Sequence, residues 1–135
     1  MAIFVLTDAV ITVNAVELSN RSNKVELNFE IDSVEVTTMG AVGHVFAGGL
    51  QNNSCAVDLF QDFATSNVEA TIYPLVGTTT SVTVKATSAA TSATNPLYTL
   101  SGTFLAAHTP VSGSTGDVAM TSLSFTGGTL VKTTA

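Results

Sequence analysis

The sequence predicts a small, mainly β domain: a sandwich or barrel of about seven strands with one short α-helix. Three observations lead to this fold class. The chain has 135 residues, about the length of one domain with one core. It is rich in Val and Thr, which favour strands, and poor in the Leu, Lys, Arg and Glu that fill helices. Residues 25–32 alternate apolar and polar side chains, as a half-buried strand does. We therefore expect residues 1–135 to form a single β domain.

The chain carries little charge, and most of that charge is acidic. Charged residues make up 10% of the sequence, against about 25% in a typical soluble domain. A hydrophobic content of 45% predicts a folded chain. Four Lys and Arg stand against ten Asp and Glu, for a net charge of -6. Nucleic-acid affinity depends on basic side chains that neutralise phosphates, so this composition excludes an ordinary DNA- or RNA-binding protein.

The chain shows no sequence signal for export or for a membrane. Its first residues lack the basic region and the long apolar stretch of a signal peptide. No apolar run approaches the roughly 20 residues that a membrane helix needs. The single cysteine, Cys55, cannot form an internal disulfide. We expect a protein that is synthesised in the cytoplasm and does not insert into a membrane.

The first third of the chain predicts a hairpin and an acidic strand. Residues 10–13 and 16–18 flank Asn14-Ala15, which reads as a tight turn. In the strand 25–32, one face carries Val25, Leu27, Phe29 and Ile31, and the other carries Glu26, Asn28, Glu30 and Asp32. Beyond Asp32-Ser33 the apolar residues change parity, which predicts a bulge or a sharp bend.

A long glycine-rich loop is predicted at about residues 39–53. It contains four glycines, yet it also holds apolar side chains that a loop facing only solvent would not carry: Met39, Val42, Val45, Phe46 and Leu50. A long apolar loop indicates a surface that a partner covers.

The middle of the chain predicts a strand and then the helix. Residues 54–60 form the strand, in which Cys55 alternates with apolar neighbours and reads as a buried thiol. Ser66-Asn67-Val68-Glu69 fits a capping box, and apolar residues follow at helical spacing until Gly77. Pro74 predicts an irregular last turn, because it cannot donate a backbone hydrogen bond.

The last part of the chain predicts three further strands. They cover residues 81–86, 98–107 and 118–126. Residues 87–95 are small and polar and should form an extended surface connection. Residues 110–117 contain Pro, Gly and Asp, which favour a turn that joins the last two strands into a hairpin.

The sequence predicts no catalytic, cofactor-binding or metal-binding site, and we expect a protein that is not an enzyme. His44 and His108 lie in no recognisable nucleophile–base pattern. We expect His108 to cap a strand end and His44 to lie at a surface. Glu26 and Glu30 share one face simply because of strand periodicity, and the chain has no Trp to form a sugar platform. Two separated histidines and one cysteine form no ligand cluster of known spacing.

Scarce charge and abundant strand edge together indicate self-assembly. An isolated β domain with open edges tends to pair with other chains, and charged residues are depleted in the cores of interfaces. If the apolar surface is buried between copies, the low charged fraction follows.

The order of the segments resembles the major tail tube proteins of long-tailed, siphovirus-like bacteriophages over nearly the whole chain. The matching segments are 4–9 (FVLTDA), 13–19 (VNAVELS), 25–40 (VELNFEIDSVEVTTMG), 60–63 (FQDF), 68–75 (VEATIYPL), 95–98 (NPLY), 116–118 (GDV) and 122–127 (SLSFTG). One departure is Ala15, where proteins of this kind often have Gly after the hairpin Asn.

The resemblance implies a homohexameric ring that stacks into a hollow tube in the virion tail and conducts DNA during ejection. It also implies tape measure and tail terminator proteins as partners. On this reading, the candidate lumen-lining residues are Glu26, Glu30 and Asp32, although the same row could be a solvated outer face. The candidate ring-stacking contacts are Met39, Val42, Val45 and Phe46.

Two other classes remain open at this point. A capsid decoration or tail-completion protein with a similar β fold would bind a different lattice and need not polymerise alone. An enzyme or a carbohydrate-binding module is disfavoured, because the chain lacks the site chemistry of either.

Overall fold

The computed structural model describes residues 5–65 and 67–134. These residues form ten strands, one α-helix and two short 3-10 helices. The strands are β1 (Val10–Val13), β2 (Val16–Glu17), β3 (Ser22–Asn28), β4 (Ile31–Glu35), β5 (Phe46–Gln51), β6 (Ser54–Phe60), β7 (Thr79–Lys85), β8 (Leu97–His108), β9 (Met120–Thr126) and β10 (Thr129–Thr133). The helices are η1 (Ser19–Arg21), α1 (Val68–Ile72) and η2 (Tyr73–Leu75). Phe4 of the opening segment and Ser66 of the predicted capping box lie outside the described residues.

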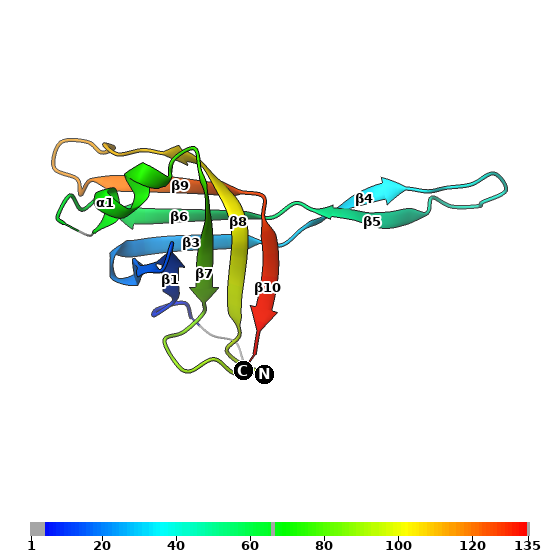
Figure 1. The fold of residues 1–135 in the computed structure, drawn as a ribbon, viewed down its shortest axis with the longest axis horizontal. Helices are drawn as coiled ribbons and strands as arrows, with labels where there is room; N and C mark the ends of the chain where they lie inside the picture. The colour runs from blue at the N-terminus through cyan, green and yellow to red at the C-terminus, as the bar shows by residue number, and fades with distance from the viewer. Residues whose placement is uncertain (1–4, 66, 135) are drawn as a thin grey trace.

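Eight strands form one antiparallel sheet that folds over into a sandwich (Figure 1). The order is β2-β1-β7-β8-β9-β6-β3. The long strand β8 joins the two layers: one of its edges pairs with β7, and the other pairs first with β10 and then with β9. The remaining strands, β4 and β5, pair only with each other. They form a narrow ribbon that projects from the sandwich in Figure 1.

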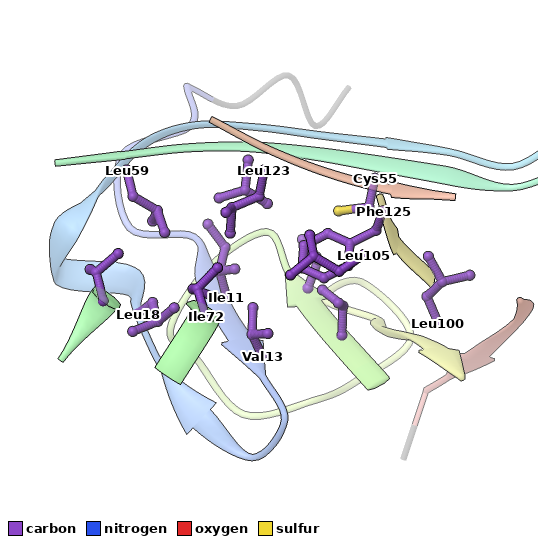
Figure 2. Packing of buried hydrophobic residues seen from close by; sticks show 14 residues of the cluster. Ile11, Val13, Leu18, Cys55, Leu59, Ile72, Leu100, Leu105, Leu123 and Phe125 are labelled. Atoms are coloured by element: carbon purple, nitrogen blue, oxygen red, sulfur yellow. The ribbon is translucent and has the colours of Figure 1, made fainter. Parts of the chain in front are cut away.

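The core lies between the two layers of the sandwich. Alternate residues of β6 and β9 are buried, as the period of two in a strand requires. In Figure 2, Leu59, Leu123 and Phe125 point from one layer toward Ile11 and Ile72 on the other side of the core. All fourteen hydrophobic residues that are buried in the described part of the chain belong to this single cluster. The mainly β sandwich with one short helix confirms the predicted fold class.

Several predicted details are confirmed. Asn14 and Ala15 both have positive φ, 49° and 66°, so the first hairpin has the left-handed turn that suits paired strands. Cys55 is buried. After Ile72 the helix changes to the 3-10 turn η2, which contains Pro74, and Gly77 follows with φ 83°. The β4–β5 register also shifts between Ile31 and Ser33. The extra residue lies on β5, however, so this bulge does not account for the change of parity beyond Asp32-Ser33 that predicted one.

Three predictions about strands are wrong. The predicted loop 39–53 is a loop only near its start, because Phe46–Gln51 pairs with β4 as strand β5. The acidic strand ends at Asn28, so Phe29 and Ile31 leave the sheet and are 57% and 49% exposed. Strand β10 was not predicted at all, and with β5 and the separation of β4 from β3 it raises the number of strands above seven. Glycines hid β5 from a propensity-based reading, since Gly is depleted in ordinary strands.

The predicted capping box depends on Ser66, which lies outside the described residues, so it stays a prediction. Asn67 precedes α1 and makes no side-chain cap hydrogen bond. Its amide donates instead to Asp62 at 2.9 Å. The carboxylate of Glu69, which a capping box would turn back to the helix start, contacts Gln61 and His108.

No helix within the described ranges is long and apolar enough to cross a membrane.

Candidate assembly surfaces

The outer face of strands β3, β6, β9 and the end of β8 is covered by small and polar side chains. Residues paired across antiparallel strands point to the same face. One row across this face reads Glu26, Ala56, Ser124 and Ala107, and all four residues are exposed. The next row reads Lys24, Asp58 and Ser122, in which the Ser122 hydroxyl donates to Asp58 at 2.9 Å. We call this the small-residue face; its ionisable residues are Glu26, Lys24 and Asp58, and the partly exposed Phe60 and Phe104 lie on the same face.

The structure separates the three predicted lumen residues. Glu26 lies on the small-residue face, Glu30 lies in the connection between β3 and β4, and Asp32 lies on the ribbon. All three are exposed. They do not form one row, because the sheet ends at Asn28 and the chain leaves it there. Of the three residues, only Glu26 lies on the small-residue face, and a role for any of them in a lumen stays a prediction.

The ribbon, comprising β4, β5 and the connection 36–45, presents apolar side chains without any cover. Every residue from 28 to 52 is exposed. Met39 and Val42, in the connection, are fully exposed, and Val45 and Phe46 are 51% and 59% exposed. The four residues predicted as stacking contacts therefore all lie on the outer half of one projecting element.

The ribbon is held at its base by a buried amide. Asn53 is 1% exposed. Its Oδ1 accepts from the backbone N–H of Glu30 at 3.2 Å, and its Nδ2 donates to the Gln51 side chain at 2.8 Å and to the Gly128 carbonyl at 3.1 Å. One side chain thus ties both strands of the ribbon to the turn between β9 and β10.

A second apolar surface lies on the sandwich, along the free edge of β3. A groove of about 430 Å³ opens there between β3 and the layer of β7, β8 and β10. Its apolar walls include Val25, Leu27, Phe29, Val84, Tyr98 and Leu130. We call it the edge groove. Sequence reasoning missed the edge groove because Leu130 in its wall belongs to strand β10. The five residues Thr129–Thr133 are too short and too irregular in pattern to predict a strand.

His108 belongs to a buried polar network. Its side chain is 2% exposed, and its Nε2 lies 2.9 Å from a Glu69 carboxylate oxygen. The hydroxyl of Thr121 lies 2.8 Å from its Nδ1. Gln61 donates to the same Glu69 oxygen at 3.2 Å and to the Pro110 carbonyl at 2.6 Å. The contacts from Thr121 through His108 to Glu69 resemble a catalytic triad. However, Thr121 is 1% exposed, so its hydroxyl is not accessible to a substrate. This network joins helix α1 to the ends of β8 and β9.

Two groups have shifted acidity, and both shifts have structural causes. A hydrogen bond of 2.7 Å from Arg21, supported by the backbone N–H of Ala64, lowers the pKa of Asp62. Burial raises the pKa of the Cys55 thiol to about 12, so it is an unreactive core group. Within the described ranges, no three His, Cys, Asp or Glu side chains gather as a metal site would require.

Comparison with known proteins gives a likeness in fold. No family model matches the sequence, and no curated protein matches it. Among solved structures, a chain of the PVC sheath/tube terminator, from an extracellular contractile injection system in the extended state, superposes with a TM-score of 0.73 at 13% identity, covering 98% of this chain and 97% of that chain. A chain of the virion of a native gene transfer agent (GTA) particle gives 0.71 at 15% identity, covering 93% and 95%.

A third likeness comes from a structure of known symmetry. A chain of the tail of an empty GTA particle, computed with helical refinement and C6 symmetry, gives a TM-score of 0.61 at 15% identity, covering 95% and 96%. At identities this low, the comparisons establish the fold alone. The fold of this chain is the tail-tube-like β-sandwich that the sequence predicts.

Proposed function

We propose that this protein is the structural subunit of a tail tube, which assembles as rings of six copies stacked into a hollow conduit for DNA. The observation that carries this proposal is the ribbon: a projecting element with no buried residue and an apolar surface that one copy cannot cover. The tail-tube-like fold supports it, and the C6 symmetry of the similar GTA tail supports the number six.

In this proposal, sheet edges are closed between neighbouring copies of one ring. Strand β3 has a free edge, and the end of β8 lies at the opposite side of the same layer. Pairing these edges around a ring removes the open backbone groups that otherwise invite aggregation. The small-residue face then forms the inner wall.

An acidic inner wall suits a conduit that must not retain its cargo. Six copies at -6 each carry -36, and charges act over about 8 Å at physiological salt. The acids nearest the lumen therefore matter most. We assign Glu26 to the wall, and Glu30 and Asp32 to the rim where the ribbon leaves the sheet.

The ribbon supplies the contact between stacked rings through Met39, Val42, Val45 and Phe46. The tube so formed lies in the tail of a virion or a virion-like particle and is assembled in the host cytoplasm. A tail terminator at the tube end and a tape measure protein inside are its expected partners.

Electron microscopy of the purified protein in negative stain tests this proposal. We expect rings or tubes at high protein concentration. Particles that stay monomeric at millimolar concentration would overturn it.

The role of the wall is tested by charge reversal. The double variant Glu26→Lys and Glu30→Lys should still form rings but release DNA more slowly. A matched control reverses Glu17 and Asp117, two exposed acids away from the small-residue face, and should release DNA at the normal rate. Equal release by both variants would remove Glu26 and Glu30 from the lumen.

A second candidate is a tail-completion protein that caps a tube, and the likeness to a chain of the PVC sheath/tube terminator favours it. Such a protein would form single rings without stacking. Micrographs that show only isolated rings at every concentration would select this candidate.

A further inference from the structure

The structure holds two apolar surfaces that none of the described residues of the same copy covers. One is the ribbon, on which Val34, Val36, Val45 and Phe46 are each about half exposed. The other is the edge groove along β3. The lining of the edge groove includes no charged residue, which is typical of the centre of an interface.

We infer that the edge groove of one copy receives the apolar ribbon of another copy. This inference rests on the proposed function, because it names the surface on which the stacking ribbon binds. The groove is large enough for ribbon side chains, and the two surfaces differ in charge.

The ribbon cannot fill its own groove. Figure 1 shows the ribbon extending away from the sandwich, while β3 and β10 stay within it. The backbone pairing of β4 with β5, extended by the hydrogen bond from Val36 to the Val45 carbonyl at 2.8 Å, keeps the ribbon straight. A ribbon that fills the groove must therefore come from a second copy. The groove volume of about 430 Å³ lies within the range of about 300–1,000 Å³ of natural binding pockets, so it can hold a few ribbon side chains.

The charges on the two surfaces are opposite. No Lys or Arg occurs between residues 25 and 84, so the ribbon carries the acids Asp32 and Glu35 without a basic residue. His44 contacts Glu35 near the end of the ribbon. On the sandwich, Lys132 pairs across from Tyr98, which places both residues on the face that lines the groove.

In the described part of the chain, Lys132 lies in no ion pair with an acidic side chain. Lys24 does not add to this charge, because it lies on the small-residue face, across from Asp58. Lys132 can orient an acidic ribbon, since complementary charge sets register more than affinity.

A single ribbon in a single groove is a small contact. Stable interfaces bury about 1,200–2,000 Å² in total, and one groove of this size supplies less. Repeated around a ring, however, the contacts act together, and linked sites bind far more tightly than one site does. We therefore expect weak pairing between free copies and firm stacking between rings.

A photo-crosslinker at Phe46 tests the inference in the assembled protein. The change Phe46→p-benzoylphenylalanine should yield crosslinks between copies that map to the groove walls, namely residues 25–29, 84–86, 98 and 130. The same crosslinker at Val111, which is 83% exposed and lies in the 110–117 turn, should not label these walls. Tubes in which Phe46 crosslinks only to other parts of the sandwich would overturn the groove while leaving the proposed function intact.

A groove-filling variant gives an independent readout. Ala86, half-buried at the groove, is replaced in Ala86→Trp, which should leave rings but shorten tubes at least tenfold. The control Ala90→Trp places the same bulk at an exposed position outside the groove and should form tubes of normal length. If Ala86→Trp forms normal tubes, the groove inference is wrong. If the unmodified protein forms neither rings nor tubes, the proposed function fails as well.

Discussion

The sandwich and the ribbon are equally apolar in sequence, but they use their apolar residues in opposite ways. The sandwich contains all fourteen buried hydrophobic residues, including Leu59 and Phe125. The ribbon contains none, and its Leu50 is 82% exposed. A sheet of several strands folded over a core is stable by itself, whereas a two-stranded hairpin in water is marginal at best. The difference teaches that this chain completes one part of its fold alone and leaves the other part for a partner to complete.

The first test of this comparison removes one leucine side chain from each region. Leu59→Ala should lower the free energy of unfolding by about 2–5 kcal/mol, because it leaves a cavity in the core. Leu50→Ala should change it by less than about 0.5 kcal/mol. Chemical denaturation of the two variants measures both values. Equal losses would mean that the ribbon has a core contact within one copy.

A second pair of variants compares glycines. Gly128 has φ 92°, and a Cβ there would lie 2.6 Å from the Ser101 carbonyl oxygen. Gly128→Ala should therefore cost about 2–4 kcal/mol, from strain and overpacking together. Gly40, on the ribbon, also has positive φ, 89°, but its Cβ would meet nothing within 4 Å. Gly40→Ala should leave the thermal unfolding of the sandwich unchanged, and a matching loss of stability would contradict this contrast.

The base of the ribbon should respond to the loss of Asn53. Asn53→Ala leaves the Glu30 N–H and the Gly128 carbonyl without their buried partner, at a cost of about 1–3 kcal/mol. Hydrogen exchange should then accelerate across β4 and β5 before it changes in β9. Uniform acceleration over the whole chain would show that ribbon and sandwich open together.

The sandwich has a weak point in its first hairpin. Ala15 has φ 66°, a conformation that glycine adopts without the penalty that Cβ imposes. Ala15→Gly should raise the stability of the sandwich by about 0.5–1 kcal/mol, measured as a shift in thermal midpoint. A decrease would mean that the entropy of the added glycine exceeds the relieved strain.

The smallest expected contrast is between two ion pairs. The pKa of Asp62 is below its usual 3.8 because Arg21 donates to the carboxylate. Its contribution is present above pH 3.8 and is lost as the pH falls through the lower, folded-state pKa. Asp62→Asn should therefore destabilise the sandwich slightly at neutral pH and not at all in strong acid. Glu35→Gln, which alters the exposed pair with His44 on the ribbon, should have no effect on unfolding at either pH. A pH-independent loss for Asp62→Asn would assign its effect to packing.

Sequence reasoning succeeded where local patterning and burial agree. The alternation of Cys55, Val57 and Leu59 predicts β6 correctly, because each of these side chains has a core to face. Sequence reasoning failed where a strand is defined by backbone pairing and has no buried side chains. Gly48 and Gly49 predicted a loop, yet they lie in strand β5. Because they have no side chains, they can lie close to Ile31, Asp32 and Val34 across the ribbon.

The candidate surfaces divide in the same way. The exposure of Met39 was predictable, because an apolar side chain beside several glycines has no strand face to join. Phe46 is exposed as predicted but lies in strand β5, which the sequence did not predict. The separation of Glu26, Glu30 and Asp32 was not predictable from the sequence. The alternation of apolar and polar residues continues to Asp32, whereas strand β3 ends at Asn28. The edge groove depends on Leu130 in strand β10. The Asn53 contacts depend on Gly128, which lies 75 residues after Asn53 in the chain. No local pattern reports such distant pairings.

The ribbon is covalently continuous with two neighbouring strands of one sandwich layer. Strand β3, at the edge of the layer, leads into β4, and β5 returns into β6, which is the neighbour of β3 in the sheet. Tension applied at the far end of the ribbon therefore travels along two peptide backbones and enters the sheet through β3 and β6. It does not pull on a flexible tether, and no row of hydrogen bonds is peeled open one by one. A filament of such copies would resist stretching with the stiffness of extended backbone.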